Sequence, residues 1–189
     1  EARKPVIFAG GGVISGGAHE ELLAFAEKTG IPVAHSMMGK GAFPETHPLS
    51  LGMVGMHGLV HTNYAFSECD LLIGLGVRFD DRVTGKLDEF CPQAKIVHVD
   101  IDPAEINKNV KSDLALTGDV KEVLSSLLDL LEGLDERSYA LWREQIAVWR
   151  KQYPLRYENK GLKPQYIIEQ IYELTGGEVY LTTDVGQHQ

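Results

Sequence analysis

The sequence predicts an α/β protein in which helices cover both faces of a parallel β-sheet. Short apolar runs such as Leu71–Leu75 have the composition of strands that are buried on both faces. Segments with apolar residues at helical spacing alternate with these runs, as in sheets built from strand–helix–strand units. Glycines or acidic residues recur where successive strands end. Because the carboxyl ends of parallel strands meet at one edge, we expect a ligand site there.

The composition is that of an ordinary globular protein. Of 189 residues, 43% are hydrophobic and 24% are charged, which allows a sizeable core. The 18 basic and 27 acidic residues give a net charge of −9, which argues against nucleic-acid or anionic-membrane binding. Cys69 and Cys91 have no spacing typical of a disulfide framework or a zinc site. With no membrane-length apolar run and no signal peptide, we expect a cytoplasmic protein.

The first predicted unit resembles the opening of a dinucleotide-binding fold. A strand over Lys4–Ala9 is followed by Gly10–Gly12 and by a helix predicted over Ala18–Thr29, with an apolar face at Leu22, Phe25, Ala26 and Thr29. The glycine spacing is not G-x-G-x-x-G, and the second strand, residues 31–34, ends in His35 rather than an acid. The standard NAD fingerprint is therefore missing. A phosphate-binding loop and a tight turn without a ligand both remain open.

Two glycine-rich segments follow. Ser36–Gly41 carries Met37 and Met38, which suit contact with a flat aromatic ring, although packing in the core is the commoner role of methionine. Residues 46–52 are predicted to be a turn-rich connection. Val54–Gly58 then leads into a helix predicted over Leu59–Glu68. His57 and His61 are four residues apart, but no third ligand is placed beside them, so we predict no metal site.

The most specific segment follows the strand Leu71–Leu75. It breaks at Gly76 and carries two arginines and two acids within five residues, Arg78, Asp80, Asp81 and Arg82. Guanidinium groups are planar forks suited to phosphate, and carboxylates can hold them in place or bind hydroxyl groups. The alternative is a charged surface loop with mutual ion pairs, which would carry little meaning.

Two further strands carry acids at their ends. A strand over Lys95–Val99 leads to Asp100, a candidate for a ribose or adenine contact, and Asp102 is predicted to cap a helix that begins at Pro103. A short strand over Leu114–Thr117 precedes Asp119, which is predicted to cap the next helix. That helix has an apolar stripe of Val120, Val123, Leu124, Leu127, Leu128 and Leu131.

The remaining third suggests a boundary between domains. A helix over Asp135–Gln152 carries an aromatic and aliphatic seam that would pack either on a partner surface or on the same domain. A helix over Lys163–Leu174, with Ile167, Ile171 and Leu174 on its buried face, and a strand over Val179–Thr183 follow. We therefore predict a Rossmann-like domain over 1–134, a helical connector over 135–162, and the first helix and strand of another domain over 163–189. Both ends look like cut points in a longer protein.

Four motifs resemble the catalytic subunit of acetohydroxyacid synthase (acetolactate synthase), a thiamine diphosphate enzyme. They are Gly-Val-Arg-Phe-Asp-Asp-Arg-Val-Thr-Gly at 76–85, Val-Gly-Met-His-Gly at 54–58, Asp-Ile-Asp-Pro at 100–103 and Thr-Asp-Val-Gly-Gln-His-Gln at 183–189. The resemblance covers essentially the whole chain. It implies the central FAD-binding domain, the connector and the start of the domain that binds thiamine diphosphate.

Carried over by position, the resemblance implies three groups of cofactor-binding residues. One group would meet FAD at the first glycine turns: Gly10, Gly11, Gly12, Ser36, Met37, Met38, Gly55, Met56, His57 and Gly58. A second would hold its flavin, ribityl and phosphate parts and its adenosine: Gly76, Arg78, Asp80, Arg82, Val83, Asp100, Ile101, Asp119 and Val120. The third would make the first contacts to thiamine diphosphate: Val185, Gly186, Gln187 and His188.

The family resemblance also implies a reaction for the parent protein. Pyruvate would be decarboxylated and condensed with a second 2-keto acid, pyruvate or 2-ketobutyrate, in branched-chain amino acid biosynthesis, with FAD taking no net redox part. The glutamate that activates the cofactor and the motif that binds Mg²⁺ lie outside this sequence. We therefore expect the segment to be inactive alone, with no catalytic residue and no metal ligand of its own. A homodimer or tetramer and a regulatory small subunit are the implied partners.

Two alternatives have different consequences. A flavin-dependent pyruvate oxidase shares the architecture, but the arginine segment argues against it. A non-catalytic nucleotide-binding module, such as an electron-transfer flavoprotein subunit, would have no reason to carry the terminal Gly186-Gln-His-Gln.

Overall fold

The structure is a computed structural model that describes residues 2–133, 139–158, 161–184 and 186. It divides into two compact units, Glu1–Tyr153 and Pro154–Gln189, which are described separately below.

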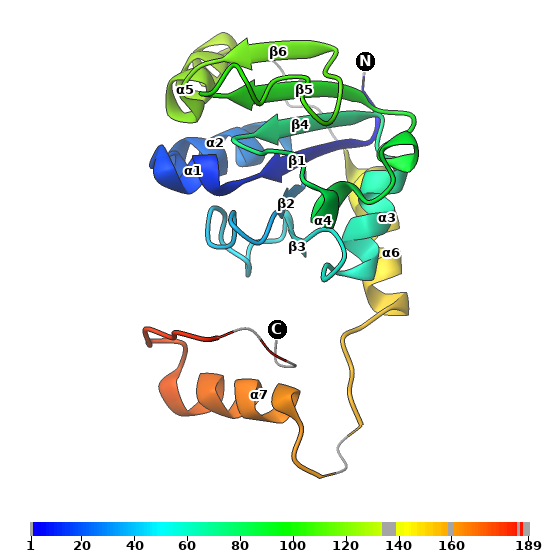
Figure 1. Cartoon of the computed structure of the whole chain (residues 1–189), viewed down its shortest axis with the longest axis vertical. Coiled ribbons are helices and arrows are strands. Elements are labelled where there is room, and N and C mark those ends of the chain that lie inside the picture. The colour runs from blue at the N-terminus through cyan, green and yellow to red at the C-terminus, as the bar shows by residue number, and fades with distance from the viewer. Residues whose placement is uncertain (1, 134–138, 159–160, 185, 187–189) are drawn as a thin grey trace. The chain divides into compact units, whose positions relative to one another are not determined.

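The first unit is built on a sheet of six parallel strands in the order β3-β2-β1-β4-β5-β6 (Figure 1). The strands are β1 (Pro5–Ala9), β2 (Val33–His35), β3 (Ser50–Met53), β4 (Leu71–Leu75), β5 (Lys95–Asp100) and β6 (Leu114–Thr117). The chain runs outward from β1 to β3, then returns to the other side of β1 and runs outward to β6. The strand order therefore reverses between β1 and β4, where open α/β sheets bind ligands. The predicted α/β fold is confirmed.

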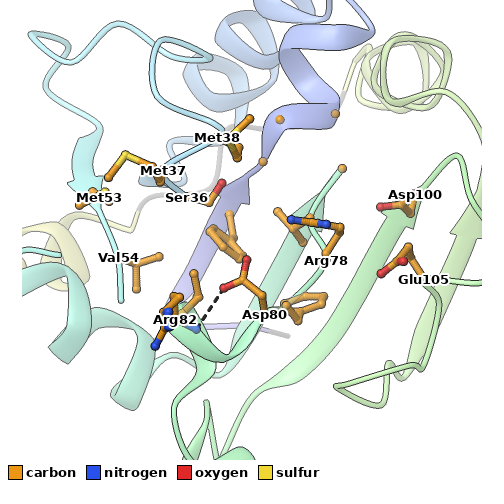
Figure 2. A pocket seen from close by; sticks show the side chains of 18 of the residues that line it. Ser36, Met37, Met38, Met53, Val54, Arg78, Asp80, Arg82, Asp100 and Glu105 are labelled. Carbon is orange, nitrogen blue, oxygen red and sulfur yellow. Dashed lines mark hydrogen bonds between the residues drawn. The ribbon is translucent and has the colours of Figure 1, made fainter. Parts of the chain in front are cut away.

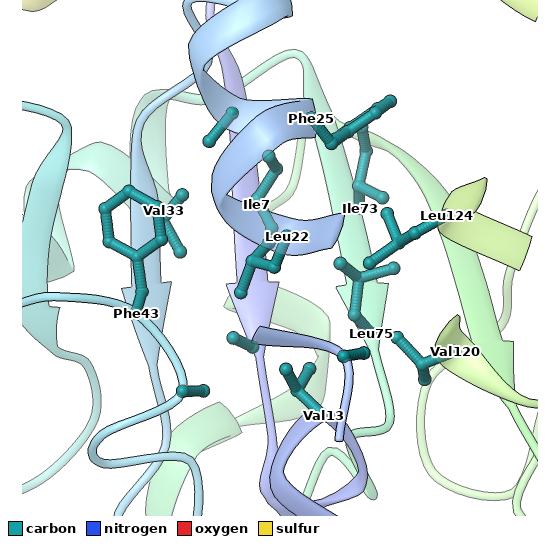
Figure 3. Close-up of a cluster of buried hydrophobic side chains, with 14 of the residues drawn as sticks. Ile7, Val13, Leu22, Phe25, Val33, Phe43, Ile73, Leu75, Val120 and Leu124 are labelled. Atoms are coloured by element: carbon teal, nitrogen blue, oxygen red, sulfur yellow. The ribbon is translucent and has the colours of Figure 1, made fainter. Parts of the chain in front are cut away.

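Helices cover both faces of this sheet, because alternate strand residues point in opposite directions. Ile7 and Ala9 of β1 belong to one buried cluster, with α1 (Gly11–Ser15), α2 (His19–Thr29) and α5 (Val120–Leu130). Figure 3 shows Leu22 and Phe25 of α2 over the strands, with Leu124 of α5 beside them. Val6 and Phe8 belong to a second cluster on the other face, with α3 (Val60–Glu68) and α6 (Ala140–Gln152).

The aromatic seam of α6 packs on its own unit, which was one of the two alternatives left by the sequence. Trp142, Ile146 and Trp149 are buried, and the Trp142 Nε1–H donates to the Pro5 carbonyl at 3.1 Å. At the other end of α6, the Arg150 guanidinium donates to the Ser50 carbonyl. Burial and the nearby Arg150 charge lower the pKa of His61, which lies under this contact. The exposed face of α6 includes Leu141, so contact of that face with a neighbouring domain stays a prediction.

Three local predictions were wrong. Residues 50–53 form the edge strand β3 instead of continuing a turn. The segment after Pro103 makes turns instead of a helix, and Asn107 has a φ of 60°, which interrupts helical geometry. Asp102 nevertheless caps the first turn, since its Oδ1 accepts from the Ala104 N–H at 2.9 Å. Residues 179–183 form no strand in the described part of the chain, because a strand needs a partner to pair with.

The other short elements complete the chain. The glycine turn after β1 contains the single-turn helix α1, which the sequence did not reveal, and α4 (Asp81–Thr84) and a 3₁₀ turn (Leu87–Glu89) follow the arginine segment. The second unit contains α7 (Pro164–Thr175). The predicted buried face of α7 is not buried within its unit, where Ile167 and Leu174 are 45% and 84% exposed. One helix of this length cannot form a core by itself. The proposed domain assignment of residues 135–189 stays a prediction.

Candidate functional site

A cavity of about 620 Å³ lies at the carboxyl ends of the strands, across the point where the strand order reverses. The residues that line it belong to β1, β2, β3, β4 and β5 or to the turns that follow these strands (Figure 2). The sequence-predicted residues that it brings together are Gly10, Gly11, Gly12, Ser36, Met37, Met38, Met56, His57, Gly76, Arg78, Asp80, Arg82, Val83 and Asp100. Residues from positions 8 to 105 thus line one cavity at the edge where the strand ends converge.

The turns after β1 and β4 touch through their backbones. The Gly10 N–H donates to the Leu75 carbonyl at 2.9 Å, and the Gly12 N–H donates to the Gly76 carbonyl at 3.1 Å. A Cβ on Gly12 would lie 2.6 Å from the Gly76 Cα, so neither turn has room for a side chain here. The glycines are therefore required by the contact between the two turns. The same contact leaves bare backbone facing the cavity, which a pyrophosphate can approach closely.

All four methionines of the chain line this cavity. Met37, Met38 and Met56 are 44%, 71% and 60% exposed, so they do not fill the core. Met37, Met53 and Val54 lie near the ends of β2 and β3 (Figure 2), and Met38 lies against Gly11 of the first turn. Flexible thioethers on an open surface suit contact with a flat aromatic ring, which was the alternative to core packing that the sequence left open.

The arginine segment is held by its backbone and by one buried ring. Phe79 has a φ of 49°, which costs a bulky residue on the order of 1–3 kcal/mol. Burial of its ring against Phe8 and His98 offsets this cost. The unusual turn buries the Phe79 ring at the base of the cavity, which Arg78 and Asp80 also line.

The charged side chains of this segment form one exposed ion pair, Arg82 with Asp81. The Asp80 carboxylate caps α4 by accepting from the Arg82 N–H at 3.1 Å, and the Arg82 carbonyl accepts from the Met56 N–H at 2.8 Å. The Arg82 guanidinium lies 4.0 Å from Asp81, with both side chains largely exposed. In the part of the chain that the structure describes, Arg78 makes no ion pair. The alternative of mutual ion pairs thus holds only for the exposed Arg82–Asp81 pair, and the Arg78 fork is available to an anion.

The end of the cavity beside β5 is acidic. Asp100 is 7% exposed, and its Oδ1 accepts from the Asp102 N–H at 2.9 Å. Glu105, which the sequence analysis missed, also lines the cavity. Its Oε1 accepts from the Lys108 ammonium at 2.7 Å, whereas its Oε2 is buried and has no hydrogen-bond partner among the described residues. The expected helix after Pro103 hid this residue, since a turn brings it back over the end of β5.

Other predicted residues do not line the cavity. Ile101 is 69% exposed, Val120 is buried in the core, and Asp119 caps α5 by accepting from the Lys121 N–H at 2.8 Å. Gly55 and Gly58 form the turn beneath Met56 and are absent from the lining. Gly186 belongs to the second unit, and Val185, Gln187 and His188 lie outside the described residues.

The described residues form neither a metal site nor a membrane-spanning helix. Over the described ranges, no three His, Cys, Asp or Glu side chains are grouped so that they could hold a metal ion. His61, one of the two histidines considered, is buried with its Nε2 3.1 Å from the Leu51 carbonyl. None of the helices in those ranges has the length and apolar character needed to cross a membrane.

Comparisons with known proteins give the family of the chain. Residues 1–127 match the family described as the central domain of thiamine pyrophosphate enzymes. The whole chain is 50% identical to a probable acetolactate synthase large subunit of Methanocaldococcus jannaschii and covers 33% of it. It is 49% identical to acetolactate synthase 1, chloroplastic, of Zea mays, covering 30%, and 46% identical to an acetolactate synthase large subunit of Buchnera aphidicola, covering 34%. The chain thus spans about a third of the length of these relatives.

Proposed function

The chain belongs to the family of thiamine pyrophosphate enzymes, whose central domain it matches over residues 1–127, and we propose that it is the FAD-binding segment of an acetolactate synthase large subunit. The observation that carries this proposal is one continuous cavity across the β1–β4 switch point, with methionines toward β2 and β3 and carboxylates toward β5. A dinucleotide with a flat ring at one end and a sugar at the other fits this arrangement of chemistry. The cavity volume of about 620 Å³ is within the range of small-molecule sites.

The middle of the cavity supports a pyrophosphate. The bare glycine turns of β1 and β4 lie there, and Arg78 supplies a guanidinium without an internal ion-pair partner in the described structure. A charge-assisted bond between Arg78 and a phosphate would hold the cofactor across the switch point. Arg82 is a weaker candidate, since its backbone fixes the loop while its side chain is 71% exposed.

The position of the acids favours FAD over NAD. In an NAD site of this fold, an acid near the end of the second strand binds the ribose. Here β2 ends in His35, whose Nδ1 lies 2.9 Å from the Ser36 carbonyl. The carboxylates lie instead beyond β5, on the far side of β1 and β4. We therefore place the adenosine beside β5 and the flavin beside the methionines.

For the longer protein we propose the activity that the names of the relatives state. It would convert pyruvate, alone or with 2-ketobutyrate, to acetolactate or acetohydroxybutyrate, with thiamine diphosphate and Mg²⁺ held partly by other segments. Bound thiamine diphosphate would supply the chemistry of decarboxylation, and this chain would supply the FAD site. Several relatives are named large subunits, which supports a small-subunit partner. A homodimer or tetramer and a cytoplasmic location also stay predictions, since the Zea mays relatives are named chloroplastic.

The two alternatives lose support in different ways. The relatives compared above are named acetolactate synthases and match the chain over its whole length, which favours that activity over pyruvate oxidase. A free-standing nucleotide-binding module would not need residues 164–189 beyond the sheet.

Substitution of Arg78 tests this proposal. Loss of one charge-assisted contact costs on the order of 1.5–3 kcal/mol, so Arg78→Ala should weaken FAD binding about ten- to a hundred-fold. Isothermal titration of the 189-residue chain, and in parallel of the longer protein, measures this directly. Arg143→Ala is the matched control, because Arg143 is exposed on α6 and does not line the cavity. Unchanged FAD affinity in Arg78→Ala would refute the assignment.

A further inference from the structure

The carboxylate of Glu105 has one oxygen whose binding capacity nothing in the described chain uses. Its Oε2 is buried and without a hydrogen-bond partner, although the residue lines the cavity. Buried carboxylate oxygens in folded proteins normally accept hydrogen bonds, so an unpaired one calls for an explanation. Figure 2 shows the Glu105 carboxylate beside Asp100 and turned toward the cavity. The position and the missing partner together indicate an acceptor for a ligand.

The rest of Glu105 is fixed in place. Its N–H donates to the Asp102 carbonyl at 3.1 Å, and its Oε1 accepts from the Lys108 ammonium at 2.7 Å. The neighbouring turn is tied to the arginine segment, since the Asn109 side-chain amide donates to the Arg78 carbonyl at 3.1 Å. The Lys108 ammonium thus fixes one oxygen of the carboxylate and leaves the other without a partner. The acceptor is thus oriented before any ligand arrives, which lowers the entropic cost of binding.

Asp100, the acid that the sequence singled out, is hydrogen-bonded through one of its two oxygens. Its Oδ1 accepts from the Asp102 N–H at 2.9 Å, and its Oδ2 lies 3.9 Å from the Nε2 of His98. That Nε2 lies closer to the Val77 carbonyl, at 2.8 Å. Through Oδ1, Asp100 therefore holds the turn that carries Glu105. Of the two acids, Glu105 is the one with a buried oxygen that has no hydrogen-bond partner among the described residues.

Resting on the FAD assignment above, we propose that Glu105 determines specificity for the ribose of the adenosine half by accepting a hydrogen bond from a ribose hydroxyl. A carboxylate accepts from O–H donors and repels anions, so the partner is a neutral sugar hydroxyl rather than a phosphate. Glu105 and Asp100 together place two negative groups at this end of the cavity. A nucleotide with a phosphate on that ribose is disfavoured there, because its charge would meet theirs.

Paired flavin titrations of the 189-residue chain test the proposal. FMN carries the flavin, the ribityl chain and one phosphate but no adenosine. Glu105→Ala should weaken FAD binding about ten- to a hundred-fold and leave FMN binding unchanged. Lys108→Ala removes the outer ion pair but keeps the carboxylate, and should change FAD affinity by no more than about fivefold. Glu89→Ala is the matched control, because Glu89 pairs with Lys86 at the same 2.7 Å but lies outside the cavity.

A second measurement separates recognition from folding. Because Glu105→Ala removes an unpaired buried oxygen, the ligand-free variant should unfold at the same temperature as the wild type or a higher one. Equal losses for FAD and FMN, or unchanged FAD affinity, would overturn the proposal. So would a wild type that binds FAD no more tightly than FMN, although flavin binding itself would then stand.

Nucleotides without a flavin separate this inference from the proposed function. If the wild type binds neither flavin, the FAD assignment fails, and ADP with 2′,3′-dideoxy-ADP tests Glu105 alone. The wild type should then prefer ADP, and Glu105→Ala should bind the two equally, as expected when a variant and an analogue remove the same hydrogen bond. A preference that persists in Glu105→Ala, or absence of any ADP binding, refutes the role of Glu105.

Discussion

Gly76→Ala should destabilise the sheet unit by roughly 2–6 kcal/mol, the combined cost of a left-handed backbone and a steric clash. The φ of Gly76 is 57°, and a Cβ there would lie 2.5 Å from the Gly12 Cα and 3.0 Å from its carbonyl carbon. Both are backbone atoms, so no side chain can rotate away. The turns after β1 and β4 would have to separate, which would also open the middle of the cavity and weaken nucleotide binding.

Gly17→Ala is the control that measures the cost of a left-handed backbone without a steric clash. Its φ is 60°, nearly that of Gly76, but nothing lies within 4 Å of the added Cβ. It should cost about 1–2 kcal/mol, the penalty for a left-handed residue alone. Urea unfolding followed by circular dichroism compares the two variants. Equal destabilisation by the two variants would show that the close contact between the turns does not add to the cost of Gly76→Ala.

Trp142→Ala should cost about 3–5 kcal/mol, as expected for truncation of a large buried aromatic side chain. Trp142 is 3% exposed, lies against Trp149 with ring centroids 5.7 Å apart, and donates to the carbonyl of Pro5 in the central strand. Its truncation would leave both a void and an unpaired carbonyl under the sheet. Leu141→Ala, at an adjacent position that is 83% exposed, should change stability by no more than about 0.5 kcal/mol.

Hydrogen exchange and the Trp142→Ala variant together decide whether α6 belongs to the sheet unit. Hydrogen exchange should protect α6 to a degree comparable with α5 in the wild type, and Trp142→Ala should lower the protection of both. If Trp142→Ala left the unfolding midpoint unchanged, α6 would be an appended helix, and the boundary predicted after residue 134 would describe the unit better than the one at 153.

The long-range architecture was predictable because burial and topology leave simple patterns. Leu71–Leu75 is apolar throughout, since both faces of a central strand are covered, and this pattern predicted β4 with its observed bounds. The N-cap of α5 was equally clear, because Asp119 precedes a continuous apolar stripe. The edge strand β3 was missed among turn-forming residues, although Leu49, Leu51 and Met53 alternate with Ser50 and Gly52 in a two-residue period.

The site was only partly predictable, because contacts between turns that are distant in the sequence leave no local sequence pattern. Gly76 and Gly12 are separated by 64 positions, 76 minus 12, so their mutual requirement appears only in the fold. The hydrogen bond from the Asp102 N–H to Asp100, and the buried unpartnered oxygen of Glu105, depend on a turn that replaced an expected helix. Local rules predicted which residue types gather at the sheet edge. They did not predict which of those residues are already bonded.

The central claim is that this cavity binds FAD, and calorimetric titration of the chain with FAD, FMN and NAD tests it most directly. FAD should bind more tightly than either competitor, because it alone reaches the methionines, the Arg78 guanidinium and the carboxylates beyond β5 together. FMN should lose the contacts beside β5, and NAD should find no acid at the end of β2. NAD binding more tightly than FAD, or no measurable binding of FAD by the longer protein, would contradict the assignment.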